Sequence, residues 1–276
     1  MIALPEWSYE ATGKMKHLEN LMSILRNTSA IALMIAMGGT MVHAQTKPAA
    51  KDVVIVHGAL ADGSGWRAIY DILNKDGFHV TIVQEPLTGL AEDVDATKRV
   101  IDQQTGPVVL VGHSYGGSVI TEAGNDAKVS ALVYVAALQP DKGEASGQLM
   151  SKFAAPNDAM RAATNRAAPD VKYFYIPAAK FRETYAADVP AAEAKFMSDS
   201  QQQLAEKAMG APLTEAAWHT KPSFAILTTK DHVISPELQR WMYQRSGAKV
   251  TEVPASHAVF VSQPEAVAKV IEAAAK

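Results

Sequence analysis

A buried strand, a glycine-rich turn and a helix follow one another in residues 108–125. Residues 108–111 form a continuous apolar run that is typical of a strand inside a parallel sheet. The next six residues read GHSYGG, and residues 118–125 have a helical pattern. A G-x-S-x-G turn in this setting bends so sharply that its serine is strained and its hydroxyl stands above the sheet. The pattern therefore predicts a unit that presents Ser114 as a nucleophile.

Strands and helices alternate along most of the remaining chain. The β-branched and apolar runs predict strands at 52–57, 79–83, 107–111, 129–136, 223–229 and 248–253. Helical patterns lie between or after them, at 65–75, 91–104, 118–125, 236–245 and 264–274. Strands that alternate with helices of this length are typical of βαβ units. We therefore expect an α/β fold, with a mostly parallel sheet flanked by helices.

Residues 139–221 interrupt this alternation. They are rich in Ala, Met, Gln and polar residues, with helical patterns and only a weak strand signal at 171–176. A helical cap insertion over one end of the sheet would have this composition. Its large apolar side chains either line an apolar pocket or pack the interior of the cap. They are Tyr173, Phe174, Tyr175, Phe181, Tyr185, Phe196, Trp218, Met150, Met160, Met197 and Met209.

The N-terminal segment has the layout of a secretory signal peptide. Lys16 and Arg26 supply positive charge, residues 30–42 are apolar, and the sequence VHA ending at Ala44 resembles an A-x-A cleavage site. The apolar stretch is shorter than the roughly 20 residues that a transmembrane helix needs. An uncleaved N-terminal anchor is the alternative.

These features divide the chain into two parts. We expect residues 1–44 to comprise an upstream extension and a signal peptide at 15–44, cleaved after Ala44. Residues 45–276 would then be one α/β domain that is periplasmic or secreted and has no membrane span in its mature form. The net charge of −3 and the scattered Lys and Arg residues argue against nucleic acid as a partner. The chain has no cysteine, which excludes disulfides, a thiol nucleophile and thiolate metal ligands.

A serine hydroxyl needs a positioned base, and the base needs an acid to orient it. Among the eight histidines, His257 follows the last predicted strand and precedes the last helix, so it should lie beside Ser114. Asp231 stands at the end of the strand before it, which gives the order Ser–Asp–His along the chain. His232 is the rival base, and Asp231 could alternatively be an ordinary loop or helix-capping aspartate.

The tetrahedral intermediate also needs backbone N–H donors for its oxyanion. One should come from Tyr115, the residue after the nucleophile. The other should come from the loop after the first strand, where Gly58 permits a turn that directs the N–H of Ala59, or alternatively that of Leu60, into the site.

Four segments of the chain resemble the α/β-hydrolase superfamily, in its small bacterial esterase-like branch related to plant methylesterases and hydroxynitrile lyases. They are HGALADGSGW (57–66), GHSYGG (112–117), TTKDHVISPELQRW (228–241) and PASHAVFVSQPEAV (254–267). The resemblance implies a catalytic triad of Ser114, His257 and Asp231, an oxyanion hole at Ala59 and Tyr115, a helical cap, and no cofactor or metal. The related lyases typically have lysine after the catalytic histidine and threonine in the oxyanion loop. Here Ala258 and Gly58 occupy those places, which favours hydrolysis.

The leading hypothesis is a serine hydrolase that cleaves small carboxylic esters through an acyl-enzyme. Residues near the motifs or in the cap are candidates for contact with this small-molecule substrate: Leu60, Trp66, Trp218 and Phe260. The same triad would also serve a lactonase or an amidase. A catalytically weak ligand-binding protein with this fold is the alternative from a different class.

Overall fold

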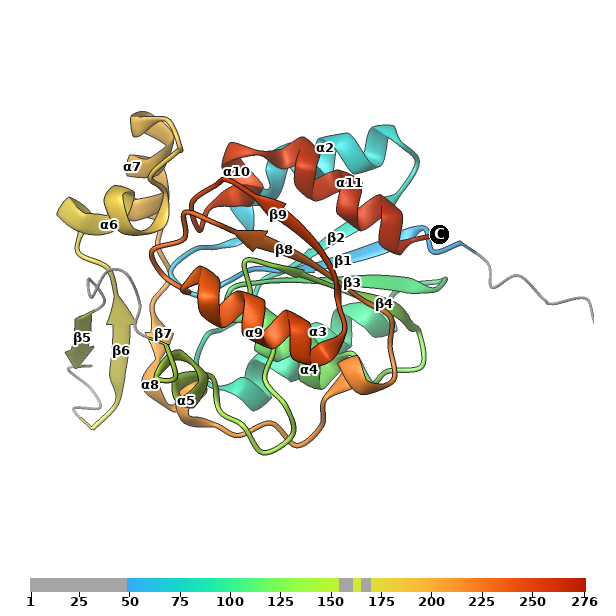
Figure 1. Cartoon of the computed structure of the whole chain (residues 1–276), viewed down its shortest axis with the longest axis horizontal. Helices are drawn as coiled ribbons and strands as arrows, with labels where there is room; N and C mark the ends of the chain where they lie inside the picture. The colour runs from blue at the N-terminus through green and yellow to red at the C-terminus, as the bar shows by residue number, and fades with distance from the viewer. Residues whose placement is uncertain (1–48, 154–160, 165–169) are drawn as a thin grey trace, which may run out of the picture. The chain divides into compact units, whose positions relative to one another are not determined.

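The computed structural model describes residues 49–153, 161–164 and 170–276 (Figure 1). The chain divides into two units, Met1–Lys47 and Pro48–Lys276, and every described residue belongs to the second unit. The predicted extension, signal peptide and cleavage site all lie outside the described residues. Within the described part, no helix has both the length and the hydropathy needed to cross a membrane.

A six-stranded sheet occupies the centre of this unit (Figure 1). Its strands lie in the order β2-β1-β3-β4-β8-β9, and every neighbouring pair is parallel. Strands β1 and β3 are buried along their whole length because they carry the continuous apolar runs. All six strands predicted from the sequence form. Their bounds are β1 Asp52–Val56, β2 His79–Val83, β3 Val108–His113, β4 Val129–Val135, β8 Ser223–Thr228 and β9 Lys249–Val253.

Helices cover both faces of the sheet (Figure 1). One face carries α2 (Arg67–Lys75), α10 (Val259–Ser262) and α11 (Pro264–Ala274), and the other carries α3 (Leu90–Asp102), α4 (Gly116–Ala123) and α9 (Pro236–Ser246). Two short 3-10 helices, Gly63–Trp66 and Ala217–His219, complete this part of the fold. In α11, Val267, Val270 and Ile271 recur at helical spacing and are buried against the sheet. This doubly covered parallel sheet confirms the predicted fold class.

The register of the sheet brings four loops to the same edge. Val56 pairs with Gly112 in the neighbouring strand, and Thr228 pairs with Val253. Because all the strands are parallel, the loops after β1, β3, β8 and β9 leave the sheet on the same side. These loops carry the predicted site residues Ala59, Leu60, Ser114, Tyr115, Asp231 and His257.

The insertion between β4 and β8 contains helices and a small second sheet (Figure 1). Its helices are α5 (Ser146–Met150), α6 (Ala178–Tyr185), α7 (Ala191–Asp199) and α8 (Glu206–Gly210). Its three-stranded antiparallel sheet has the order β5 (Arg161–Thr164), β6 (Lys172–Tyr175) and β7 (Leu204–Ala205). Only β6 corresponds to the weak strand signal at 171–176. The other two strands were not predicted, because β7 has two residues and β5 has the alanine-rich sequence RAAT, which favours no strand.

Candidate active site

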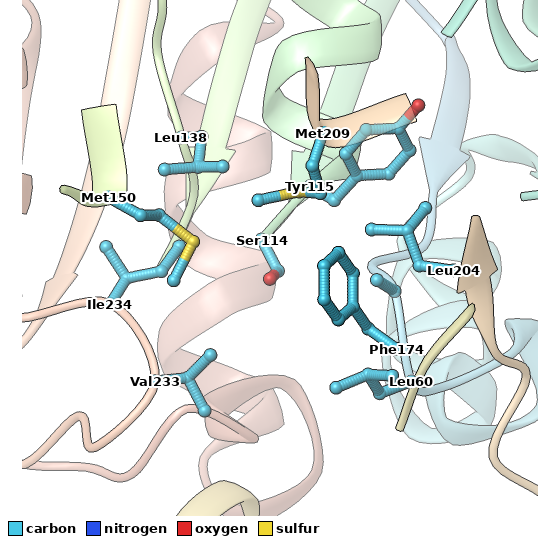
Figure 2. A pocket seen from close by; sticks show the side chains of 11 residues that line it. Leu60, Ser114, Tyr115, Leu138, Met150, Phe174, Leu204, Met209, Val233 and Ile234 are labelled. Carbon is cyan, nitrogen blue, oxygen red and sulfur yellow. The ribbon is translucent and has the colours of Figure 1, made fainter. Parts of the chain in front are cut away.

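Ser114 lies in the tight turn between β3 and α4. Its φ of 53° is in the left-handed region, a conformation that costs a non-glycine residue on the order of 1–3 kcal/mol. A side chain at Gly116 would place its Cβ 2.6 Å from the carbonyl oxygen of His57, so only glycine lets the turn pack this closely. The surrounding structure thus imposes the strain at Ser114, and the serine hydroxyl points into a cavity (Figure 2). The predicted strand–turn–helix unit is present.

Two backbone N–H groups beside Ser114 are free to bind an anion. The N–H groups of Ala59 and Tyr115 donate to no described residue, and both residues line the same cavity as Ser114. The alternative donor, Leu60, is already used, because its N–H donates to the carbonyl oxygen of Gln202 at 3.0 Å. The structure therefore leaves Ala59 as the available donor in the loop after β1.

His257 and Asp231 form a hydrogen-bonded pair in the interior. Nδ1 of His257 lies 2.8 Å from Oδ2 of Asp231, and both side chains are fully buried. An ionised carboxylate only accepts hydrogen bonds, so Nδ1 carries the proton in this pair. Nε2 of His257 is buried and hydrogen-bonds to no described residue. This nitrogen is therefore available as a proton acceptor.

The Asp231 carboxylate is held in place by four further donors. Oδ1 accepts from the backbone N–H groups of Val233 (2.8 Å) and Ile234 (3.0 Å). Oδ2 accepts from the Thr228 hydroxyl (2.8 Å) and from Nε2 of Gln239 (3.0 Å), in addition to His257. Hydrogen bonds to the charged form offset the cost of burying a carboxylate. Asp231 has the loop-turn bonds of an ordinary aspartate on one oxygen and orients the histidine with the other.

Gln239 and Thr228 were not predicted as site residues from the sequence. Gln239 is a fully buried side chain of α9, and its amide also accepts from the N–H of Thr228 and donates to the carbonyl oxygen of Ile234. A signal was present: Gln239 follows the helix N-cap Ser235 by four residues and shares the inward face with Leu238 and Met242.

Two other histidines lie near the Asp231–His257 pair in sequence or in space. His232 is not bonded to this pair, whereas His113 packs next to it. His232 Nδ1 lies 3.1 Å from the carbonyl oxygen of Glu183, and the ring is not bonded to Asp231. His113, the neighbour of Ser114, donates through Nε2 to the carbonyl oxygen of His257 at 3.0 Å. Burial, together with the nearby ring of His257, lowers the pKa of His113 well below its usual value, so His113 is neutral. It ties the nucleophile turn to the loop that carries His257.

The cavity at Ser114 is small and apolar (Figure 2). Its volume is about 30 Å³. The hydroxyl of Tyr115 is bonded to Asp93 (2.9 Å), so among the described lining residues the Ser114 hydroxyl is the polar side-chain group that remains for a ligand. The lining residues come from the sheet edge and from the cap: Ala59, Leu60, Ser114, Tyr115, Leu138, Met150, Phe174, Leu204, Met209, Val233 and Ile234.

Of the four residues predicted to contact substrate, only Leu60 lines this cavity. Trp66 and Phe260 are fully buried and stack on each other at 4.8 Å between ring centroids. Trp218 is also buried, donates to the carbonyl oxygen of Pro140 at 2.8 Å, and packs under Arg245. These three predictions need correction, because the aromatic rings are used for packing. Leu138, Val233 and Ile234 line the cavity without having been predicted, while Met160 lies outside the described residues.

No cluster of three or more His, Asp or Glu side chains is arranged to hold a metal ion in the part of the chain that the structure describes. The arrangement there is a strained serine and two free N–H donors at one apolar cavity, together with a histidine–carboxylate pair whose imidazole packs beside that of His113, the neighbour of the serine. Such a set can perform nucleophilic acyl transfer.

The chain is similar in sequence and in fold to several known proteins. A chloroplastic protein of Arabidopsis thaliana that carries the name methylesterase 11 is 27% identical over 253 residues, covering 79% of this chain but 62% of that protein. A pyrethroid hydrolase of Sphingobium wenxiniae is 26% identical over 251 residues, covering 80% of this chain and 86% of that enzyme. The crystal structure of polyneuridine aldehyde esterase has the same fold, with a TM-score of 0.70 at 20% identity over 80% of this chain and 98% of that one. The family model described as "Alpha/beta hydrolase family" matches residues 53–270, and the chain belongs to this family.

Proposed function

We propose that this chain is a serine hydrolase that cleaves small carboxylic esters. The observation that carries the proposal is the buried Asp231–His257 pair: Nε2 of His257 has no described partner, and the His257 ring lies 4.7 Å, between centroids, from the ring of His113, the residue before the strained Ser114. The names of the relatives, a methylesterase and a pyrethroid hydrolase, also support ester hydrolysis.

In the acylation step, the Ser114 hydroxyl attacks the ester carbonyl carbon while Nε2 of His257 takes its proton. Asp231 keeps the imidazole in the required tautomer and offsets the positive charge that develops. The N–H groups of Ala59 and Tyr115 bind the oxyanion, each contributing on the order of 3 kcal/mol in the transition state. The tetrahedral intermediate then collapses, and the departing alkoxide takes the proton from His257.

Deacylation repeats these roles with water as the nucleophile. His257 removes a proton from water, the hydroxide adds to the acyl carbon, and the same two N–H groups bind the second oxyanion. Collapse releases the carboxylic acid, and the proton on His257 returns to Ser114. The cycle uses no cofactor.

The cavity favours an uncharged substrate with a short acyl group. None of the described residues that line it is charged, so a carboxylate or phosphate on the substrate would be desolvated there without a partner among them. A cavity of about 30 Å³ has room for only a few atoms in this conformation. An acetyl-sized acyl group fits best, and longer chains require the methionines in the wall to move.

The test uses p-nitrophenyl acetate and p-nitrophenyl butyrate with the wild type and the Ser114→Ala variant. We expect the wild type to release nitrophenol with a burst that is followed by turnover, and the variant to do neither. Equal rates for the two proteins, or no turnover by the wild type, would overturn the proposal. A lactone and an anilide in the same panel separate esterase from lactonase and amidase activity.

We also propose that the mature protein is exported. The support is the sequence alone: the charges at Lys16 and Arg26, the apolar residues 30–42 and the small residue Ala44. N-terminal sequencing of the protein from a periplasmic or culture fraction should begin at Gln45. A protein that remains in the cytoplasm with residues 15–44 intact would contradict export.

A further inference from the structure

The loop that carries the oxyanion donor is held by hydrogen bonds on three sides. The Gly58 carbonyl oxygen lies 2.9 Å from Nδ1 of His57, which donates to it, since Nε2 of His57 accepts from the N–H of Glu85. The Ala59 carbonyl oxygen accepts from the Tyr185 hydroxyl at 3.2 Å. The Leu60 N–H donates to the carbonyl oxygen of Gln202 at 3.0 Å. The Ala59 N–H is the group that this set of bonds leaves for a substrate.

Two of these partners belong to the cap. In a planar peptide, the carbonyl of one residue and the N–H of the next turn together. The peptide between Ala59 and Leu60 is therefore held at both ends, by the Tyr185 hydroxyl of α6 and by the Gln202 carbonyl just before β7. The Ala59 N–H itself belongs to the preceding peptide, whose Gly58 carbonyl is held by His57, and this peptide meets the one held by the cap at the Cα of Ala59. The position of the Ala59 donor thus depends, through the adjoining peptide, on contacts from the insertion as well as on its own loop.

Tyr185 also contacts the base on its other side. Its ring packs edge to face on the His257 ring, with the centroids 4.8 Å apart and the planes at 84°. Its carbonyl oxygen accepts from the N–H of Ala258 at 3.0 Å. The side chain is fully buried, and Phe181 of the same helix stacks on it at 5.1 Å. Burial raises the pKa of the Tyr185 hydroxyl above its ordinary value, so the hydroxyl remains a donor at any pH at which the protein is assayed.

A second bond fastens the end of α6 to the loop of the base. Asp188, three residues after Tyr185, accepts from the backbone N–H of Ser256 at 3.1 Å and from the Ser256 hydroxyl. Ser256 directly precedes His257. The segment around Tyr185 is therefore joined to the oxyanion loop on one side and to the His257 loop on the other.

We propose that Tyr185 is a positioning residue that sets the Ala59 donor and the His257 ring at the correct separation for one substrate carbonyl. The hydroxyl holds the peptide that directly follows the donor and so restrains the Ala59 backbone, while the ring and carbonyl support the base. Because Tyr185 lies on α6 of the cap, displacement of this helix would disturb the Ala59 loop and the His257 loop together. This inference rests on the proposed ester hydrolysis.

A tyrosine that only packed the core would affect stability, whereas a positioning residue affects the transition state. Tyr185→Phe keeps the ring and removes only the bond to Ala59. The oxyanion forms after the substrate binds, so a misdirected donor should lower kcat and leave KM nearly unchanged. We expect acylation about tenfold slower, which is less than the 10²–10³ that complete loss of a donor costs, with KM within about twofold.

Tyr134→Phe is the matched control. Tyr134 is also fully buried, on β4, and its hydroxyl bonds to the hydroxyl of Thr121 at 3.0 Å rather than to the Ala59 loop or the His257 loop. We expect this variant to acylate at the wild-type rate. Tyr185→Leu removes the ring as well and should slow acylation by about a further tenfold, because His257 loses its packing partner.

The experiment measures burst rates with p-nitrophenyl acetate for the wild type, these three variants and Ser114→Ala. Burst amplitudes give the concentration of folded active sites, so partial unfolding of a variant does not enter the rate. The proposal is supported if Tyr185→Phe is slower with an unchanged KM while Tyr134→Phe is not. Wild-type rates for Tyr185→Phe, with Ser114→Ala inactive, overturn this inference alone, whereas an inactive wild type overturns the proposed function and the inference with it.

Discussion

Nδ1 of His257 and Oδ2 of Asp231 lie 2.8 Å apart in the interior of the protein, with neither side chain exposed to solvent. The bond leaves Nε2 of His257 free, and four other donors hold Asp231 in place. The pair thus fixes both the tautomer and the direction of the base.

Replacing Asp231 by Asn should lower kcat by about 10⁴-fold, because the amide lets the imidazole adopt the wrong tautomer. The surface pair of His219 and Asp141 provides a matched control, since its nitrogen and oxygen are also 2.8 Å apart but both side chains are partly exposed. Asp141→Asn should keep the rate within twofold. Steady-state kinetics on both variants checks this, and a fall of less than tenfold for Asp231→Asn would argue against the role of Asp231.

Gly58→Ala should damage the oxyanion loop. The added Cβ would lie 2.6 Å from Nδ1 of His113 and 2.7 Å from Cβ of Ser114, so the loop must move away from the nucleophile. We expect kcat to fall at least 10²-fold, as when an oxyanion donor is lost. Gly210→Ala is the control, because its Cβ would meet nothing within 4 Å. Similar kinetics for the two variants would show that the loop after β1 does not supply a donor.

Titration of Asp93 should make the free energy of unfolding depend on pH. Burial raises the pKa of Asp93 from 3.8 to about 6, although it accepts from the Tyr115 hydroxyl (2.9 Å) and the Leu87 N–H (2.8 Å). Between these two pH values the folded protein binds more protons than the unfolded chain, so the free energy of unfolding decreases as the pH rises. The loss amounts to about 3 kcal/mol and is complete above the folded pKa.

Asp93→Asn removes this titration. Urea unfolding at pH 4.5 and pH 7.5 should therefore show that the variant gains stability relative to the wild type at the higher pH. The neighbouring Glu85 shifts in the same direction, because burial and the charge of Asp93 raise its pKa well above the usual value. A stability difference between variant and wild type that does not change with pH would contradict this account of Asp93.

The acyl preference should follow the size of the cavity. Met209→Ala removes side-chain atoms from the cavity wall and makes room for a longer acyl chain. The ratio of kcat/KM for butyrate to kcat/KM for acetate should therefore rise about tenfold, as expected for extra methylenes in an apolar pocket. Met197→Ala is the control, because Met197 is buried on α7 and does not line the cavity. The ratio of kcat/KM for the two nitrophenyl esters is the measurement. An unchanged ratio for Met209→Ala would mean that the acyl chain binds elsewhere.

The parts of the fold that the sequence predicted are those encoded by short, local patterns. The buried strands are continuous β-branched runs, and the turn at Ser114 requires glycine at Gly116, where any side chain would meet the backbone of His57. Both signals are complete within a few residues. The fold class and the strand positions therefore followed from the sequence.

The features that were missed depend on which distant residues meet. Gln239 contacts Asp231 only after α9 has packed against β8, and Tyr185 reaches Ala59 across 126 positions of the chain. Trp66 stands next to the oxyanion loop in sequence, but Phe260 stacks on it and keeps it in the core. The strands β5 and β7 are stabilised by pairing with β6 and have little signal of their own.

The central claim is that Ser114 carries the acyl group during turnover. The most direct measurement is to mix the protein with p-nitrophenyl acetate, quench the burst with acid, digest the protein and locate the acetyl group by mass spectrometry. We expect one acetyl group on Ser114 in the wild type and none at this position in Ser114→Ala. In His257→Ala, we expect Ser114 to reach the same degree of acetylation only after a much longer reaction. An acetyl group on another residue of the wild type, or turnover with no acetylated Ser114, would contradict it.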